Sequence, residues 1–184
     1  MKGLLLLAGF ILALTCAPLL FAQTKDVKIK IKDGKTIVRD KSKPVRKAIE
    51  DWCDRNIAAF NAKDVAAIMA LRTDDFHTLT PDGRTNSRSD MEGYTRRLLS
   101  NIDHFISQDF QIGTIEVTGD LASAQITQKT VRMQRFPDGT LHKVEAGVDQ
   151  RETWKRTAEG WKLYRVDMIQ EGYLLVDDTP YRQP

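Results

Sequence analysis

The sequence predicts an α+β domain in which three N-terminal helices pack on one face of an antiparallel sheet. Two observations support this fold class. Between residues 44 and 102, apolar residues recur at the spacing of three to four that is typical of helices. After Phe105 the chain changes to long runs rich in valine, isoleucine and threonine, separated by the turn signals TGD, PDG and AEG. Helices therefore precede strands, and we expect one core between them.

Residues 1–22 have the pattern of a secretory signal peptide: a basic start, an apolar run and a small residue, Ala22, before a polar stretch. We expect cleavage after Ala22 and a periplasmic or secreted protein. A membrane anchor is the weaker alternative, because Pro18 interrupts a run already short of the roughly 20 apolar residues that a span needs. Lipidation at Cys16 is disfavoured by the threonine before it.

The expected mature chain has 27 basic and 25 acidic residues, since Lys2 is removed with the signal peptide. The chain therefore lacks the excess of basic residues that is typical of nucleic-acid-binding proteins. We also expect no stable membrane insertion after cleavage. Residues 44–172 form the predicted domain and 173–184 a C-terminal tail. Residues 23–43 are lysine-rich, and their alternating VKIKIKDGKTIV predicts either an added hairpin turning at Asp33-Gly34 or a solvated arm.

The helices have recognisable start signals. The first is expected from Pro44 to about Asn61, and Asp64 is the expected N-cap of a second, VAAIMALR. The adjacent Asp74 and Asp75 are interpreted as closing that helix or capping the turn. The third is expected to begin at Ser89, with a capping box to Glu92. Its predicted buried stripe is Met91, Tyr94, Leu98 and Ile102.

The strands are expected at Gln108–Val117, Leu121–Phe136, Thr140–Arg156 and Trp161–Glu171. A type I turn at Pro137-Asp138-Gly139 would pair Phe136 with Thr140, so that paired residue numbers sum to about 276. The predicted core face of this hairpin carries Ala122, Ala124, Ile126, Val144, Ala146, Val148 and Trp154.

Five polar residues fall on these apolar faces: Asn56 on the first helix, Gln128 and Arg132 on one strand, and Gln150 and Glu152 on the next. Burying such groups without partners costs about 1–3 kcal/mol each. Together they favour a polar patch in an internal pocket. The histidines His77, His104 and His142 lack metal-ligand spacing, so we expect neither a metal nor a cofactor.

Three phrases, AAFNAKDVAAIMALRTDDF, TPDG and ETWKRTAEGWKL, resemble the nuclear transport factor 2-like cone fold, which includes ketosteroid isomerase and SnoaL-like polyketide cyclases. The resemblance covers roughly residues 45–172. It implies a strongly curved sheet around a long helix, an apolar pocket inside the cone, and frequent dimerisation through the outer sheet face. It is specific for the fold and not for function, because this scaffold carries unrelated activities.

The isomerase site is only partly matched. Asn56 stands at the position of the family's substrate-binding tyrosine, and Thr80, which cannot act as a carboxylate base, at that of the general-base aspartate. Glu152 matches the protonated aspartate that stabilises the oxyanion. Steroid isomerisation by that mechanism is therefore disfavoured.

The predicted site has Glu152 and Asn56 at its centre, and two functions remain open. One is binding of a small apolar molecule, or a scaffold role as a homodimer through Val131, Met133 and Leu163. The alternative is a small-molecule lyase, isomerase or cyclase with Glu152 as acid or base. The expected pocket lining is Trp52, Phe60, Phe76, Thr80, Tyr94, Gln128, Arg132, Gln150 and Trp154.

Overall fold

The structure is a computed structural model that describes residues 27–32, 35–40, 42–167, 169 and 172–181. The expected signal peptide and its cleavage site, and the Asp33-Gly34 turn, lie outside the described residues. Within the described ranges, no helix is long and apolar enough to cross a membrane.

The predicted α+β class is confirmed. The helices are α1 (Ser42–Asn61), α2 (Val65–Ala70) and α3 (Arg88–Asn101). The strands of the main sheet are β3 (Arg72–Leu79), β4 (Thr85–Ser87), β5 (Ile102–Thr118), β6 (Leu121–Arg135), β7 (Leu141–Thr157), β8 (Gly160–Asp167), β9 (Tyr173–Val176) and β10 (Thr179–Pro180).

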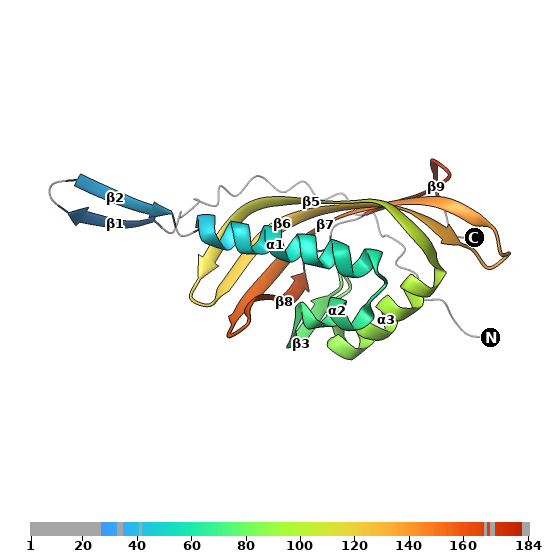
Figure 1. Cartoon of the computed structure of the whole chain (residues 1–184), viewed down its shortest axis with the longest axis horizontal. Helices are drawn as coiled ribbons and strands as arrows, with labels where there is room; N and C mark the ends of the chain where they lie inside the picture. Colours follow the sequence, from blue (N-terminus) through green and yellow to red (C-terminus); the bar gives the residue numbers. More distant parts are fainter. Residues whose placement is uncertain (1–26, 33–34, 41, 168, 170–171, 182–184) are drawn as a thin grey trace.

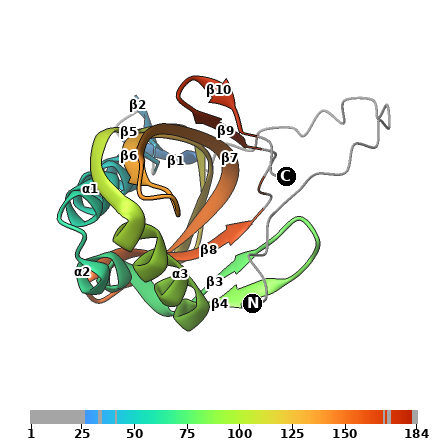
Figure 2. The same cartoon turned by 90° about the vertical axis from the view of Figure 1, so that its right-hand side faces the viewer.

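The long strand β7 organises this sheet. It pairs with β6 along one edge, β6 pairs with β5, and the other edge of β7 pairs with β8 near one end and with β9 near the other. Strand β8 then pairs with β3, and this pair is parallel, so the sheet is mixed where an antiparallel one was expected. Figure 1 shows α1 running along the sheet, and Figure 2 shows the sheet curling from β5 round to β3 with the helices beside it.

The predicted β6–β7 register is confirmed. Leu121 pairs with Lys155 and Ala122 with Trp154, which gives the expected sum. At the turn, the Phe136 N–H donates to the Thr140 carbonyl at 2.9 Å, and Gly139 adopts a φ of +86°, which glycine tolerates without strain. Ala122, Ala124, Ile126, Val144 and Trp154 are buried as predicted, while Ala146 and Val148 are partly buried.

The main core lies between α1 and the β6–β7–β8 part of the sheet. Trp52 of α1 meets Trp154 of β7 edge to face, with ring centroids 6.1 Å apart, and the Trp52 indole N–H donates to the Leu71 carbonyl at 2.9 Å. A second cluster joins α2 and α3 through Ile68, Met69 and Leu99. This second cluster also contains Ile102, the first residue of β5, which pairs with Gln134 of β6.

Helix α3 begins two residues earlier than predicted. Ser87, not Ser89, is its N-cap, and Asp90 completes the capping box. The face that packs on the core is also displaced by one residue from the prediction, which is about 100° around the helix. Thr95 and Leu99 are consequently the buried residues of α3, whereas Tyr94, expected inside, is 52% exposed.

Two further expectations are wrong. Asp74 and Asp75 belong to strand β3 and do not close α2, which ends at Ala70. Leu163, expected on the outer sheet face, is buried in the main core, because a register shift between Thr153 and Trp154 brings it opposite Trp154. The outer face loses its third apolar residue, and the homodimer through it stays a prediction.

The chain adds strands before and after the predicted domain. Strands β1 (Val27–Lys32) and β2 (Lys35–Asp40) pair antiparallel, which corresponds to the hairpin alternative for the lysine-rich segment. At the other end, residues expected to form a tail provide β9 and β10, and β9 extends the sheet beside β7. The predicted last strand ends at Asp167, earlier than expected.

Candidate functional site

Glu152 is a buried acid in the middle of the sheet. It lies on β7 between Ala124 of β6 and Val166 of β8, and only 2% of the residue is exposed. Its Oε1 accepts a 2.7 Å hydrogen bond from Gln150 Nε2, while Oε2 has no partner among the described residues. Burial raises the pKa of Glu152 to about 7, against the opposing effects of the Gln150 bond and the Arg72 charge. The acid can therefore exchange a proton near neutral pH.

The facing helix brings a second polar group with an unused atom. Asn56 of α1 is 4% exposed, and its Oδ1 has no hydrogen-bond partner among the described residues. One turn earlier, burial raises the pKa of the Cys53 thiol to about 12, and the charge of Glu152 adds to the shift. This part of α1 therefore lies within electrostatic range of Glu152.

Arg72 is a member of this region that sequence reasoning missed. VAAIMALR suggested a helix ending at this arginine, but the helix ends at Ala70 and Arg72 opens β3. Burial lowers the pKa of Arg72 to about 10, while the charge of Glu152 opposes that shift. Its guanidinium lies over the Phe76 ring, 5.3 Å from the centroid. A strand starting directly after Leu71 would have placed Arg72 and Phe76 on one face, and this was the available signal.

A second arginine shares the end of α2 with Arg72. Arg72 Nη1 donates to the Ile68 carbonyl at 2.5 Å, and Arg88 Nη2 donates to the Met69 carbonyl at 3.1 Å. Cations near a helix C-terminus offset the partial negative charge of its free carbonyls. The Nε atoms of both arginines are buried and have no hydrogen-bond partner within the described chain. These two hydrogen bonds join β3 and α3 to the C-terminal end of α2.

Three of the predicted lining residues belong to one core cluster: Trp52, Phe76 and Trp154. The indole Nε1 of Trp154 is a further buried atom without a hydrogen-bond partner. The centre therefore combines large apolar surfaces with a carboxyl oxygen, an amide oxygen and an indole N–H that the described residues leave unpaired.

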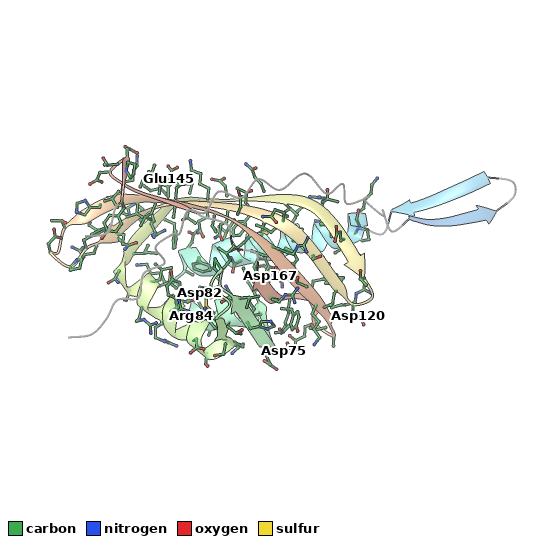
Figure 3. All side chains as sticks on the ribbon, turned by 180° about the vertical axis from the view of Figure 1, so that it is seen from behind. Asp75, Asp82, Arg84, Asp120, Glu145 and Asp167 are labelled. Carbon is green, nitrogen blue, oxygen red and sulfur yellow. The ribbon has the colours of Figure 1, made fainter. Side chains whose placement is uncertain are left out.

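Other predicted lining residues are placed elsewhere. Phe60 packs edge to face on Phe105, at 6.1 Å between ring centroids, in the second cluster. Thr80 lies in the turn after β3, where its hydroxyl donates to Asp82 Oδ1 at 2.5 Å. Figure 3 shows Asp82 beside Arg84, to which it is bound at 2.7 Å. The Thr80 hydroxyl group therefore stabilises a turn.

Gln128 and Arg132 lie farther along β6. Arg132 pairs with Val144 across the strands, eight residues from Ala124, which corresponds to about 26 Å of extended strand. Its Nε donates to Gln134 Oε1 at 2.9 Å and its Nη1 to Thr130 Oγ1 at 3.2 Å. Arg132 is therefore not part of the group around Glu152.

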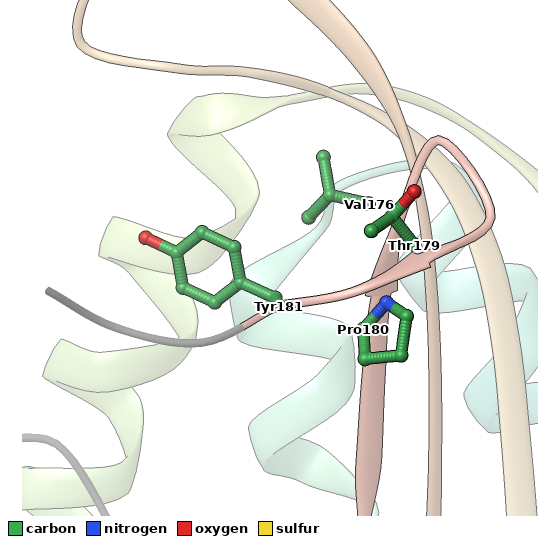
Figure 4. A pocket seen from close by; sticks show the side chains of 4 residues that line it. All are labelled: Val176, Thr179, Pro180 and Tyr181. Atoms are coloured by element: carbon green, nitrogen blue, oxygen red, sulfur yellow. The ribbon is translucent and has the colours of Figure 1, made fainter.

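A separate hollow of about 520 Å³ lies at the C-terminal hairpin, lined by Val176, Thr179, Pro180 and Tyr181 (Figure 4). None of these residues belongs to the predicted lining. Among the described residues, no group of three or more His, Cys, Asp or Glu side chains could hold a metal. His77 instead meets Tyr164 edge to face, 5.3 Å between ring centroids.

Comparison with protein families matches residues 44–167 to the SnoaL-like domain. The chain belongs to the SnoaL-like family. This family lies within the nuclear transport factor 2-like superfamily, so the resemblance inferred from the sequence is confirmed. A search of curated proteins found no match.

Solved structures agree on the fold. A conserved protein from Planctomyces limnophilus superposes with a TM-score of 0.58 at 16% identity, covering 72% of this chain and 98% of that one. A protein from Kribbella flavida gives 0.58 at 16% identity, with 71% and 94% covered. A ketosteroid isomerase-like protein from Erwinia carotovora atroseptica gives 0.51 at 17% identity, with 66% and 92% covered. At these identities the likeness is one of fold.

Proposed function

We propose that this SnoaL-like protein binds a small, mostly apolar molecule inside the cone, through a hydrogen-bonding group held at Glu152 and Asn56. The observation that carries the proposal is the pair of unpaired oxygens, Glu152 Oε2 and Asn56 Oδ1, in a region where polar atoms are costly to leave unpaired. A ligand group between α1 and β7 would supply the missing partners.

The chemistry of the unpaired atoms limits the ligand. Glu152, with a pKa of about 7, can donate a proton when neutral and accept when ionised. Asn56 Oδ1 only accepts, and Trp154 Nε1 only donates. A hydroxyl group, or a carbonyl with a neighbouring hydroxyl, satisfies this set. The rings of Trp52, Phe76 and Trp154 favour an apolar body on the rest of the molecule.

Acid–base catalysis by Glu152 is the second candidate, and the raised pKa favours it. A carboxyl group with a pKa near the working pH is suited to move a proton to and from a bound substrate. The reaction would be of the lyase, isomerase or cyclase type. In this role Asn56 would hold the substrate oxygen while Glu152 exchanged the proton.

Native mass spectrometry of protein purified from its own cells identifies the molecule that co-purifies. Affinity and turnover are then compared for the wild type, Glu152→Gln and Glu152→Leu, with the exposed Glu159→Gln as control. A binding protein should keep its affinity within a few fold in Glu152→Gln and lose it in Glu152→Leu. An acid–base enzyme should keep its affinity in Glu152→Gln but lose turnover by roughly 100-fold or more. Unchanged binding in Glu152→Leu would refute the proposed site.

A further inference from the structure

The positive charge of the chain is concentrated in the segment N-terminal to the domain. Residues 24–43 contain eight lysines and arginines against three aspartates, whereas residues 44–184 contain nineteen basic and twenty-two acidic residues. Most of these basic residues fall in β1 and β2. The fold thus carries a basic hairpin beside a slightly acidic domain.

The register of this hairpin separates two kinds of residue. Residues directly opposite one another in an antiparallel pair lie on the same face, and faces alternate along each strand. The pairs Lys28 with Arg39, Lys30 with Ile37 and Lys32 with Lys35 define one face. The pairs Val27 with Asp40, Ile29 with Val38 and Ile31 with Thr36 define the other. One face is therefore basic at five of six positions, and the other is apolar at four of six.

The hairpin has no partner within the described part of the fold. Its strands pair only with each other, as a separate two-stranded sheet. Figure 1 shows it extending beyond the first turn of α1, away from the main sheet. A lone two-stranded hairpin is only marginally stable in water. The face that carries Val27, Ile29, Ile31 and Val38 is therefore expected to be covered by something outside the domain.

We propose that the β1–β2 hairpin docks the protein on the surface of an anionic lipid bilayer. The apolar face would lie at the boundary of the acyl chains, and the basic face at the level of the phosphates. Interfacial segments bind membranes by this combination of apolar burial and attraction to anionic lipid. A nucleic acid or acidic polysaccharide would neutralise the basic face but leave the apolar face in water, so charge and apolarity together favour the bilayer.

The expected loss of membrane affinity can be estimated from the number of charges removed. Each basic residue close to an anionic membrane surface contributes about a factor of five in affinity. Neutralising three of them should weaken binding on the order of 100-fold. The attraction is also screened, so salt at about 0.5 M should weaken it strongly.

The test is co-sedimentation with vesicles of phosphatidylcholine containing about a quarter phosphatidylglycerol, and with phosphatidylcholine vesicles alone. The hairpin variant is Lys28→Gln/Lys30→Gln/Lys32→Gln. The matched control, Lys47→Gln/Lys155→Gln/Lys162→Gln, removes the same charge from the domain surface, where these lysines form ion pairs. We expect salt-sensitive binding to the anionic vesicles, lost on the order of 100-fold in the hairpin variant and changed by less than about threefold in the control.

A second variant, Ile29→Thr/Val38→Thr, keeps β-branched residues but removes apolar surface. It should weaken vesicle binding while binding to a soluble polyanion, heparin, is unchanged. All variants share the residues that precede the hairpin, so binding caused by those residues would persist unchanged in the hairpin variant. Equal binding of wild type and hairpin variant would overturn the proposal. So would binding to heparin without binding to anionic vesicles.

Discussion

The two ends of the β6–β7 hairpin use the same register but have different surroundings. At the end covered by α1, Ala122, Ile126 and Trp154 are each 0% exposed. At the end bordered by β9, Val144 is buried, but most of its neighbours are only partly buried. The register fixes which residues face inward. The covering helix decides whether they are removed from water.

The more exposed end has paired polar groups, whereas the more buried end has polar atoms without partners in the described part of the chain. At the β9 end they are paired: Lys129 and Tyr173 both bind Glu145 Oε1, at 2.9 and 2.7 Å, and His142 Nδ1 lies 2.6 Å from Asp177 Oδ2. Figure 3 shows Glu145 at this end. At the α1 end, Glu152, Asn56 and Trp154 are buried, and each has an atom without a hydrogen-bond partner among the described residues. Local conflicts of this kind are expected at functional sites.

The largest expected effect comes from removing the aromatic core of the α1 end. Trp154→Ala should lower the free energy of unfolding by about 3–5 kcal/mol, because it leaves a cavity and removes the contact with Trp52. Tyr173→Ala, in the 45% exposed position at the β9 end, should cost much less. Urea unfolding followed by circular dichroism measures both. Similar losses in the two variants would remove the distinction between the ends.

The pH dependence of stability provides a sharper test of the buried acid. The folded-state pKa of Glu152, about 7, exceeds its ordinary value of 4.5, so folding favours the protonated form. The stabilisation from this group is complete below pH 4.5 and is lost as the pH rises through 7. The free energy of unfolding should fall by about 3 kcal/mol as the pH rises from 4.5 to 7.

Glu152→Gln removes this titration and keeps the shape of the side chain. The difference in unfolding free energy between wild type and Glu152→Gln should therefore move in favour of the variant between pH 4.5 and 7, and level off above. Urea titrations at a series of pH values measure it, and exposed Glu159→Gln should show no such trend. A difference independent of pH would mean that Glu152 is not held in its protonated form by burial.

The sequence predicted well where a pattern had a local cause. The turn chemistry of Pro137-Asp138-Gly139 fixed the β6–β7 register, and this register placed Glu152 on the core face beside Trp154. Prediction from the sequence failed where the local structure depended on tertiary contacts. Arg72 was read as a helix end because VAAIMALR continues the helical pattern, but pairing with β8 takes the chain into a strand at that residue.

Tyr94 shows the same limit on α3. Both Ser87 and Ser89 are sound N-cap residues, each with an acid three positions later, and local sequence did not decide between them. The structure uses Ser87, where Asp90 accepts from the Ser87 backbone N–H at 2.9 Å. The face that packs on the core carries Thr95 and Leu99, one residue after the predicted Tyr94 and Leu98, so Tyr94 lies at the surface.

The smallest predicted effect concerns the β9 end and a glycine. Gly147 of β7 pairs with Tyr173 of β9, and a Cβ built on Gly147 would lie 2.3 Å from Tyr173 Cε1. The tyrosine ring therefore lies directly over the glycine backbone. Gly147→Ala should displace this ring and cost about 1–2 kcal/mol, a typical penalty for overpacking.

This clash is specific to one pair, so it can be separated from the intrinsic effect of alanine in a strand. In Tyr173→Ala the obstacle is absent, and Gly147→Ala added to that background should cost close to nothing or stabilise slightly, because alanine loses less backbone freedom than glycine. The double-mutant cycle, measured by urea unfolding, should therefore give a coupling of about 1–2 kcal/mol. Hydrogen exchange should show faster opening of β9 in Gly147→Ala, with Trp154 and its neighbours on β7 unchanged, because the core under α1 does not depend on the tyrosine. If the two substitutions were additive, or if the α1 end opened together with β9, the two ends of the hairpin would form one cooperative unit.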